Sequence, residues 1–254
     1  MGYSGGYEAT SLRTWELFRQ IAVVKNDAPG FMRRLGVVLL AAGSSCQQGR
    51  PKQLLPYLGR TLIEHVTRTA IASGASEVVV VLGANAQEIQ PKLIGLPVRI
   101  VVNRDWQEGL SSSIRCGVGA LGTEIQSAVI ALGDQACVTP DLFRDLAQRQ
   151  LETGAPIVAS SYDGIVGAPS SFHRSLFPEL MALNGIGGAR ELIRQSSILV
   201  ETIEFSAGNV SVEETAPTRR IYSPAGVPIP RDVFQEPQDA RAPPAHLKIW
   251  SFAA

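Results

Sequence analysis

Short apolar runs alternate with amphipathic stretches through the middle of this 254-residue chain. The runs LGVVLL at residues 35–40 and VVVVL at residues 78–82 are hydrophobic on both faces. That pattern is typical of strands in a parallel sheet that helices cover on both sides. We expect strands at six places, residues 35–40, 78–82, 98–102, 128–132, 157–160 and 198–203.

The stretches between these runs repeat their apolar residues at helical spacing. They predict helices at residues 61–72, 85–93, 111–121, 140–152, 172–183 and 189–195. Pro140 after Thr139 is a favourable helix start, because threonine can cap the first turn and proline fits its first position. Alternating strands and helices predict an α/β fold with a single doubly wound, mostly parallel, Rossmann-like sheet.

The two ends of the chain differ from the middle. Residues 1–30 hold one possible amphipathic helix before a Pro-Gly break, and residues 211–254 hold seven of the 16 prolines. We therefore expect an N-terminal extension over residues 1–30, a domain over residues 31–210 and a proline-rich arm over residues 211–254. The arm is a candidate contact for a protein partner.

Composition narrows the possible partners. The 23 basic residues balance the 23 acidic ones, which disfavours a nucleic acid or a membrane surface as the partner. The start of the chain has no signal-peptide pattern, and no apolar run approaches the roughly 20 residues that span a bilayer. Cys46, Cys116 and Cys137 are too few and too scattered for a disulfide framework. We expect a cytoplasmic protein.

The loop after the first expected strand carries the most informative pattern. It reads LAAGSSCQQGRPK over residues 40–52. Its alanines and glycines allow the backbone to approach a ligand closely, its N–H groups can surround phosphates, and Lys52 can neutralise them. The loop is neither a Walker A loop nor Gly-x-Gly-x-x-Gly, which disfavours a Rossmann dehydrogenase. A plain connecting turn is the alternative.

This loop, with the PKQLLP that ends it, resembles the signature of MobA-like nucleotidyltransferases, especially their molybdenum cofactor cytidylyltransferase branch. Further segments resemble that family in order and spacing: NRDWQEGLSSSIR at residues 103–115, ALGDQ at 131–135, GAP at 167–169 and residues 177–190. The resemblance covers roughly residues 35–205.

The resemblance implies transfer of a nucleoside monophosphate onto a phosphorylated acceptor such as molybdopterin, with release of pyrophosphate. It favours CTP as the NTP and implies Mg²⁺ as the cofactor. Lys52 and Asp134 are the implied catalytic residues, with Asp134 binding the metal. The implied nucleotide contacts are Leu40, Ala41, Ala42, Gly43, Gly49, Lys52, Gly109, Ser111 and Ser113, and the implied acceptor contacts are Gly167, Pro169 and Arg190.

Each of these residues also has a purely structural interpretation. Asp134 can cap a turn, Lys52 can be a solvated loop lysine, and the serines can simply open a helix. Arg190 can lie on a solvated helix face. We expect Cys46 and Cys137 to be passive, and His65 and His173 to lie in helices without a catalytic role.

The departures from the family pattern concentrate where the chemistry would occur. Gln47 replaces an arginine, with Arg50 as a candidate substitute, and Ile186 replaces an acid. Ala136 stands where a proline is usual and Ala168 where histidine or asparagine is usual. The D-I-D-T-P element is absent near residues 205–209, so no second carboxylate can be named for the metal.

Three hypotheses follow. The first is an active nucleotidyltransferase. The second is a catalytically weakened relative that binds a nucleotide, a pterin-like cofactor or a protein partner. The third is a sugar-phosphate nucleotidyltransferase, which shares the fold but usually has a longer acceptor domain.

Overall fold

The computed structural model describes residues 30, 32–44, 46–47, 50–162, 164–195 and 200–205. Within them lie the strands β1 (Leu35–Ala41), β6 (Glu77–Leu82), β7 (Arg99–Val102), β8 (Ser127–Leu132), β9 (Ile157–Tyr162), β10 (Ile165–His173) and β11 (Val200–Glu204). Two short hairpins join β2 (Cys46–Gln47) to β3 (Arg50–Pro51) and β4 (Pro56–Tyr57) to β5 (Arg60–Thr61).

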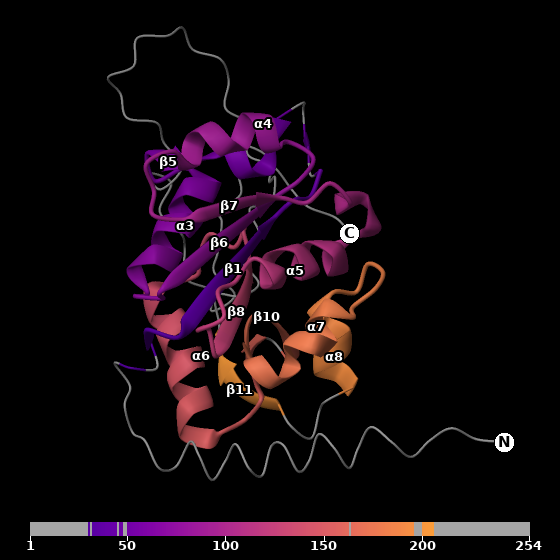
Figure 1. Cartoon of the computed structure of the whole chain (residues 1–254). Helices are drawn as coiled ribbons and strands as arrows, with labels where there is room; N and C mark the ends of the chain where they lie inside the picture. Colours follow the sequence, from indigo (N-terminus) through magenta and orange to yellow (C-terminus); the bar gives the residue numbers. More distant parts are fainter. Residues whose placement is uncertain are drawn as a thin grey trace, which may run out of the picture.

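The main sheet runs in the order β11-β9-β10-β8-β1-β6-β7 (Figure 1). Strand β10 pairs antiparallel with β8 and β9, and the other described pairs of neighbours are parallel. The expected fold class, an α/β fold with one mostly parallel sheet, is confirmed. The central strand β1 is buried along its whole length, as its uninterrupted apolar run predicts.

Helices cover both faces of this sheet (Figure 1). They are α3 (Leu62–Ala72), α4 (Ala86–Ile89), α5 (Leu110–Gly119), α6 (Pro140–Thr153), α7 (Phe177–Met181) and α8 (Ala189–Gln195), with 3₁₀ turns η1 (Lys52–Leu54), η2 (Gln90–Leu93), η3 (Trp106–Glu108) and η4 (Arg174–Leu176). Alternate residues of β1 enter two cores. Leu39 packs in the core with α3 and α6, and Val38 packs in the core with α5, α7 and α8.

Helix α6 begins where the sequence predicts. The Thr139 hydroxyl accepts a hydrogen bond from the Leu142 amide at 3.2 Å, and Pro140 occupies the first helical position. Gly154 ends the helix in the left-handed region at φ 67°. Local capping signals therefore fix both ends of this helix.

The predicted helix over residues 172–183 is wrong at its start. Phe172 and His173 belong to β10 and pair with Ala128 and Ser127 of β8. Helix α7 begins only at Phe177, with Pro178 in its first turn. Pairing inside the sheet outweighs the local helical pattern here, because a buried strand must satisfy its backbone hydrogen bonds.

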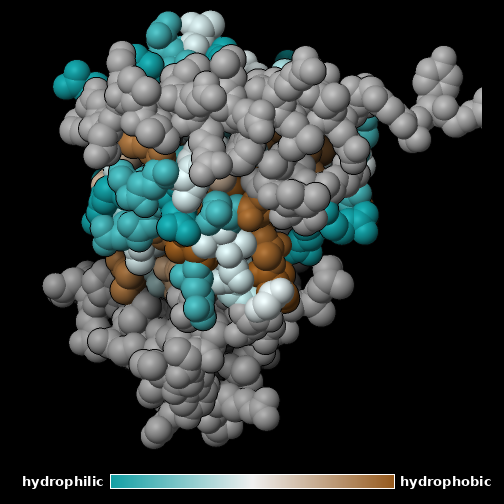
Figure 2. Space-filling model, turned by 90° about the horizontal axis from the view of Figure 1, so that it is seen from below, coloured by the Kyte–Doolittle hydropathy of each residue, from teal (hydrophilic) through white to brown (hydrophobic). Residues whose placement is uncertain are grey.

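Several predictions fall outside the described residues. They include the helix expected within residues 1–30 and the proline-rich arm over residues 211–254. In the part of the chain that is described, no helix is long and apolar enough to cross a membrane. Seen from below, the described surface places hydrophobic residues directly beside hydrophilic ones (Figure 2).

Candidate functional site

The loops that follow β1, β6, β7 and β8 meet at one edge of the sheet, because these strands run parallel. The Gly133 amide donates to the Leu40 carbonyl at 2.9 Å, and the Ala84 amide donates to the Ala42 carbonyl at 3.1 Å. Gly43 is exposed, whereas the preceding predicted nucleotide contacts are buried, namely Leu40, Ala41 and Ala42. This carboxyl edge is where open α/β sheets bind their ligands.

Lys52 and Asp134 meet at this edge, although 82 residues separate them in sequence. The Lys52 ammonium donates to Asp134 Oδ2 at 2.6 Å. Lys52 is only 8% exposed, whereas the Asp134 side chain is 31% exposed and follows β8 by two residues. The lysine is therefore a buried cation held by a carboxylate, and the interpretation as a solvated loop lysine is wrong.

Gln53 fixes the loop that follows β1. Its buried amide donates to the Ala41 carbonyl at 3.3 Å and to the Gly43 carbonyl at 3.2 Å. Its Oε1 atom is buried without a hydrogen-bond partner. Gln53 belongs to the PKQLLP motif, but its contacts with this loop are not predicted by the sequence. Because its neighbour Lys52 lies in the same 3₁₀ turn, Gln53 holds the lysine and the loop in one arrangement.

Gln135 links the turn that carries Asp134 to strand β10. Its Oε1 atom accepts from the Leu132 amide at 3.2 Å, and its amide donates to the Ala168 carbonyl at 2.9 Å. Ala168 precedes Pro169 through a cis peptide bond. One glutamine thus joins the predicted catalytic side to the predicted acceptor side. This role of Gln135 is not predicted by the sequence.

The first turn of α5 is built on Gly109 at φ 99°, where a side chain would be strained and would meet Ile186. Glycine leaves the helix without a side-chain cap. The Ser111 hydroxyl donates to the Asn184 carbonyl at 3.2 Å, so it ties the start of α5 to the loop between α7 and α8. What the turn offers a nucleotide is chiefly its backbone N–H groups and the partial positive charge of the helix end.

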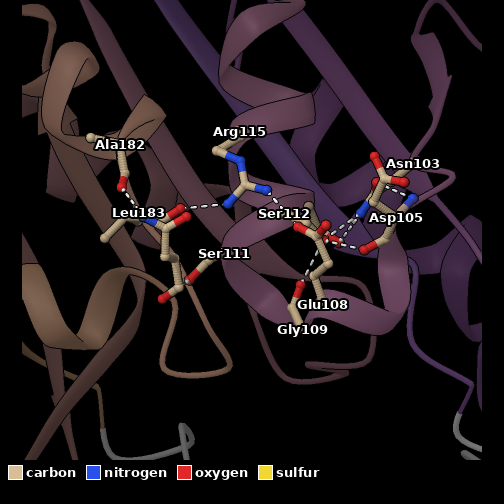
Figure 3. A network of polar contacts seen from close by, with 11 residues as sticks. Asn103, Asp105, Glu108, Gly109, Ser111, Ser112, Arg115, Ala182 and Leu183 are labelled. Atoms are coloured by element: carbon tan, nitrogen blue, oxygen red, sulfur yellow. Dashed lines mark hydrogen bonds and ion pairs between the residues drawn. The ribbon is translucent and has the colours of Figure 1, made fainter.

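Asn103 lies beside Ser112 and organises the serine cluster (Figure 3). Its buried amide donates to Ser112 Oγ at 2.8 Å and to Ser113 Oγ at 3.0 Å, and its Oδ1 accepts from the Asp105 amide at 3.0 Å. The Ser112 hydroxyl lies near the carbonyls of Asp105 and Gly109. The structural interpretation of the serines therefore holds for much of the cluster, and Asn103 is the residue that sets its geometry.

The predicted acceptor contacts lie together on the β10 side. Gly167 and Pro169 are buried and flank the irregularity in the pairing of β10 with β9. The Arg190 Nη2 atom lies 3.9 Å from the position that a Cβ on Gly167 would occupy. Arg190 is exposed, and it makes no hydrogen bond or ion pair with the described residues. Its guanidinium is therefore available to an anion.

The family departures are also placed. Ile186 is 85% exposed on the loop between α7 and α8, and Ala136 is buried. Gly49 lies outside the described residues, as do the side chains of Gln47 and Arg50. The substitution of Arg50 for the missing arginine stays a prediction.

Asp134 fits a magnesium ion only as one ligand among several. Mg²⁺ in nucleotide sites is usually held by one or two carboxylates, substrate phosphates and water. Lys52 occupies Oδ2, which leaves Oδ1 of the partly exposed carboxylate. No cluster of three or more His, Cys, Asp or Glu suited to a metal occurs among the described residues. Phosphate oxygens of a bound nucleotide would supply further ligands to the magnesium ion.

Cys116, Cys137, His65 and His173 have environments that suit passive roles, whereas the side chain of Cys46 lies outside the described residues. Burial raises the pKa of the Cys137 thiol, and burial with nearby Asp105 raises that of Cys116. Burial lowers the pKa of His65, which packs edge-on against Tyr57 with ring centroids 4.6 Å apart. His65 lies in α3 as predicted, whereas His173 ends β10 and not a helix.

Curated relatives resemble this chain over most of the described domain. Nicotine blue oxidoreductase of Paenarthrobacter nicotinovorans is 39% identical over 180 residues, covering 66% of this chain and 86% of that protein. Molybdenum cofactor cytidylyltransferase of Escherichia coli is 27% identical over 139 residues, covering 54% of this chain and 69% of that protein.

Solved structures agree with this fold. A Mycobacterium tuberculosis protein in complex with manganese superposes with a TM-score of 0.60 and 27% identity, covering 68% of this chain and 88% of that one. The model of the MobA-like NTP transferase domain matches residues 37–200, which include the loop after β1, Lys52, Asp134 and Arg190. The chain therefore belongs to the MobA-like NTP transferase family, a branch of the nucleotidyltransferases.

Proposed function

We propose that this protein transfers CMP from CTP onto a phosphorylated acceptor such as molybdopterin and releases pyrophosphate. The observation that carries the proposal is the contact of Lys52 with Asp134 at the carboxyl edge of the sheet, beside the loop after β1. The choice of CTP and of molybdopterin is supported by the PKQLLP motif and by the similarity to the Escherichia coli cytidylyltransferase.

In the proposed reaction, an oxygen of the acceptor phosphate bonds to the α-phosphorus of CTP. The bond from that phosphorus to the oxygen bridging to the β-phosphate breaks, and the electron pair leaves with pyrophosphate. Catalysis of this type depends on holding the reactants in line and on neutralising charge. It needs no nucleophilic side chain, which agrees with the passive cysteines.

The residues divide these tasks by position. The backbone after β1 and the first turn of α5 would present N–H groups to the nucleotide. Lys52 would turn from Asp134 toward the phosphates and neutralise the leaving pyrophosphate. Asp134 would hold the magnesium ion, which supplies additional positive charge to the phosphates when it is bound. Arg190 would orient the acceptor phosphate from the β10 side.

Pyrophosphate release tests this proposal. The protein is incubated with Mg²⁺, each NTP in turn and molybdopterin, and we expect release with CTP above the other nucleotides. Asp134→Ala should abolish the release, whereas Asp141→Ala, an exposed acid on α6, should not. Nucleotide binding without turnover would support the weakened relative instead. Failure to bind any nucleotide would exclude both.

A second candidate function is an oxidoreductase. It is favoured by the 39% identity to a protein named nicotine blue oxidoreductase, whose length this chain covers to 86%. Burial contributes to the raised pKa of the Cys116 and Cys137 thiols, which disfavours their reactive thiolate form, so the electrons would come from a bound donor. A reduced nicotinamide dinucleotide carries a diphosphate that suits the same N–H groups and would pass its hydride to nicotine blue. Oxidation of NADH or NADPH in the presence of nicotine blue, without pyrophosphate release, would favour this function.

A further inference from the structure

The loop between α7 and α8 lies against the N-terminal end of α5 (Figure 3). The Ser111 hydroxyl binds the Asn184 carbonyl at 3.2 Å, and the Arg115 guanidinium binds the Leu183 carbonyl. Arg115 also pairs with Glu108 at 2.7 Å. These contacts hold the loop at the border of the candidate site, so its outward-facing residues line the approach to that site. We call Leu110 and residues 185–190 the lip.

The end of the lip nearest α5 is apolar. Ile186 is 85% exposed, and Leu110 beside it is 37% exposed. Each side chain packs closely against a glycine. A Cβ on Gly109 would lie 3.0 Å from Ile186 Cγ2, and a Cβ on Gly188 would lie 2.7 Å from Leu110 Cδ2. The glycines leave room for two large hydrophobic side chains at the site border. Their exposure to water is unfavourable, so a ligand that covers them gains free energy.

The other end of the lip is cationic. Arg190 is the second residue of α8, and its guanidinium lies near Gly167 of β10. Among the described residues it has no hydrogen-bond or ion-pair partner, in contrast to Arg194 of the same helix, which pairs with Glu191 at 2.8 Å. A guanidinium that has no described partner, on the same lip as exposed apolar side chains, is complementary to an anion attached to a flat ring.

We propose that the lip makes this protein select an acceptor that combines a flat ring with an anionic group. The ring lies against Ile186 and Leu110, and the anion binds Arg190. An acidic residue in place of Ile186 would repel the anion and favour a hydrated, cation-bound acceptor; isoleucine does neither. This inference rests on the proposed function, because the lip borders the same site.

Two fluorescent probes test the proposal: anilinonaphthalene sulfonate, which has rings and an anion, and phenylnaphthylamine, its neutral analogue. Ile186→Asp should weaken binding of the neutral probe roughly tenfold, because the loss of an apolar contact of this size is about 1.4 kcal/mol, and should weaken the sulfonate by more, because the new carboxylate also repels it. Arg190→Gln should weaken only the sulfonate. Both side chains are exposed, so neither change disturbs the core.

Ile94→Asp is the matched control, since Ile94 is 77% exposed but lies in the segment that leads into the start of β7, at the opposite edge of the sheet. Its probe affinities should equal those of the unchanged protein. The proposal is overturned if Ile186→Asp leaves both affinities unchanged or if Ile94→Asp lowers them equally. CTP affinity, measured on the same variants, separates the two proposals. It should stay unchanged in Ile186→Asp. If the unchanged protein binds no CTP, that result counts against the proposed function alone.

Discussion

The two sides of the candidate site are built differently. On the proposed nucleotide side, Lys52 is buried and paired with Asp134, and Gln53 holds the neighbouring loop. On the proposed acceptor side, Arg190 is exposed without a described partner and Ile186 projects from its loop. The first side is preorganised for one charge pattern, because its polar groups constrain one another. The second can change its ligand by single substitutions, because its side chains support little else.

Relatives of this chain carry different names. An oxidoreductase at 39% identity and a cytidylyltransferase at 27% identity both resemble it. In the proposed function, a preorganised nucleotide side would suit any reaction that begins by binding a nucleotide, and the acceptor side would determine the chemistry that follows.

The largest effect should come from breaking the nucleotide side. Lys52→Met removes the buried cation, and we expect CMP transfer to fall about a hundredfold to a thousandfold, as for other groups that neutralise developing charge. CTP affinity should fall as well. Lys92→Met, at an exposed lysine of η2, is the control and should retain full activity. Equal activity of the two variants would contradict the role of Lys52.

A second prediction concerns the scaffold of the acceptor side. Burial, with Arg174 nearby, lowers the pKa of His173 from 6.5 to about 4. Between these values the unfolded chain binds more protons than the folded one, so the free energy of unfolding falls as the pH drops through this range. The loss is about 3 kcal/mol and is complete near the folded pKa.

The variant His173→Asn isolates this contribution. In the unchanged protein, His173 Nδ1 accepts a hydrogen bond from the Ser175 amide at 3.2 Å. Asparagine can also accept this hydrogen bond, but it does not titrate. Denaturant unfolding above pH 6.5 and near pH 4 should show a smaller pH dependence for the variant. An unchanged pH dependence would mean that other groups cause it.

A smaller effect is expected from the loop clamp. Gln53→Leu keeps the volume but leaves the Ala41 and Gly43 carbonyls without their donor, which costs about 2 kcal/mol of unfolding free energy. CTP affinity should fall too, because the loop after β1 is no longer held. Gln148→Leu, whose amide binds Glu152 on the outside of α6, is the control. A change in stability without any change in CTP affinity would separate the clamp from the site.

The smallest effect should come from Ser111→Ala. The hydroxyl binds the Asn184 carbonyl, so its loss should lower the unfolding free energy by about 1 kcal/mol and leave CTP affinity unchanged. Calorimetric titration of CTP into the folded variant measures this. A weaker affinity would instead make Ser111 a direct nucleotide contact.

The sequence predicts the sheet well because its strands are apolar on both faces, as in β1 and β6. It fails at β10, where Gly167, Pro169 and two serines hide a strand whose pairing with β8 is visible only in three dimensions. The resemblance places Lys52 and Asp134 at one site. The clamp by Gln53 could not be predicted, because it depends on carbonyls that only the folded loop turns toward the amide.

The most direct test of the central claim follows the label of α-phosphate-labelled CTP in the presence of Mg²⁺ and molybdopterin. We predict that the label moves to the acceptor while an equal amount of pyrophosphate forms, and that Lys52→Met and Asp134→Ala both prevent it. If the unchanged protein binds CTP but the label stays in the nucleotide, the chain does not catalyse the proposed transfer of CMP.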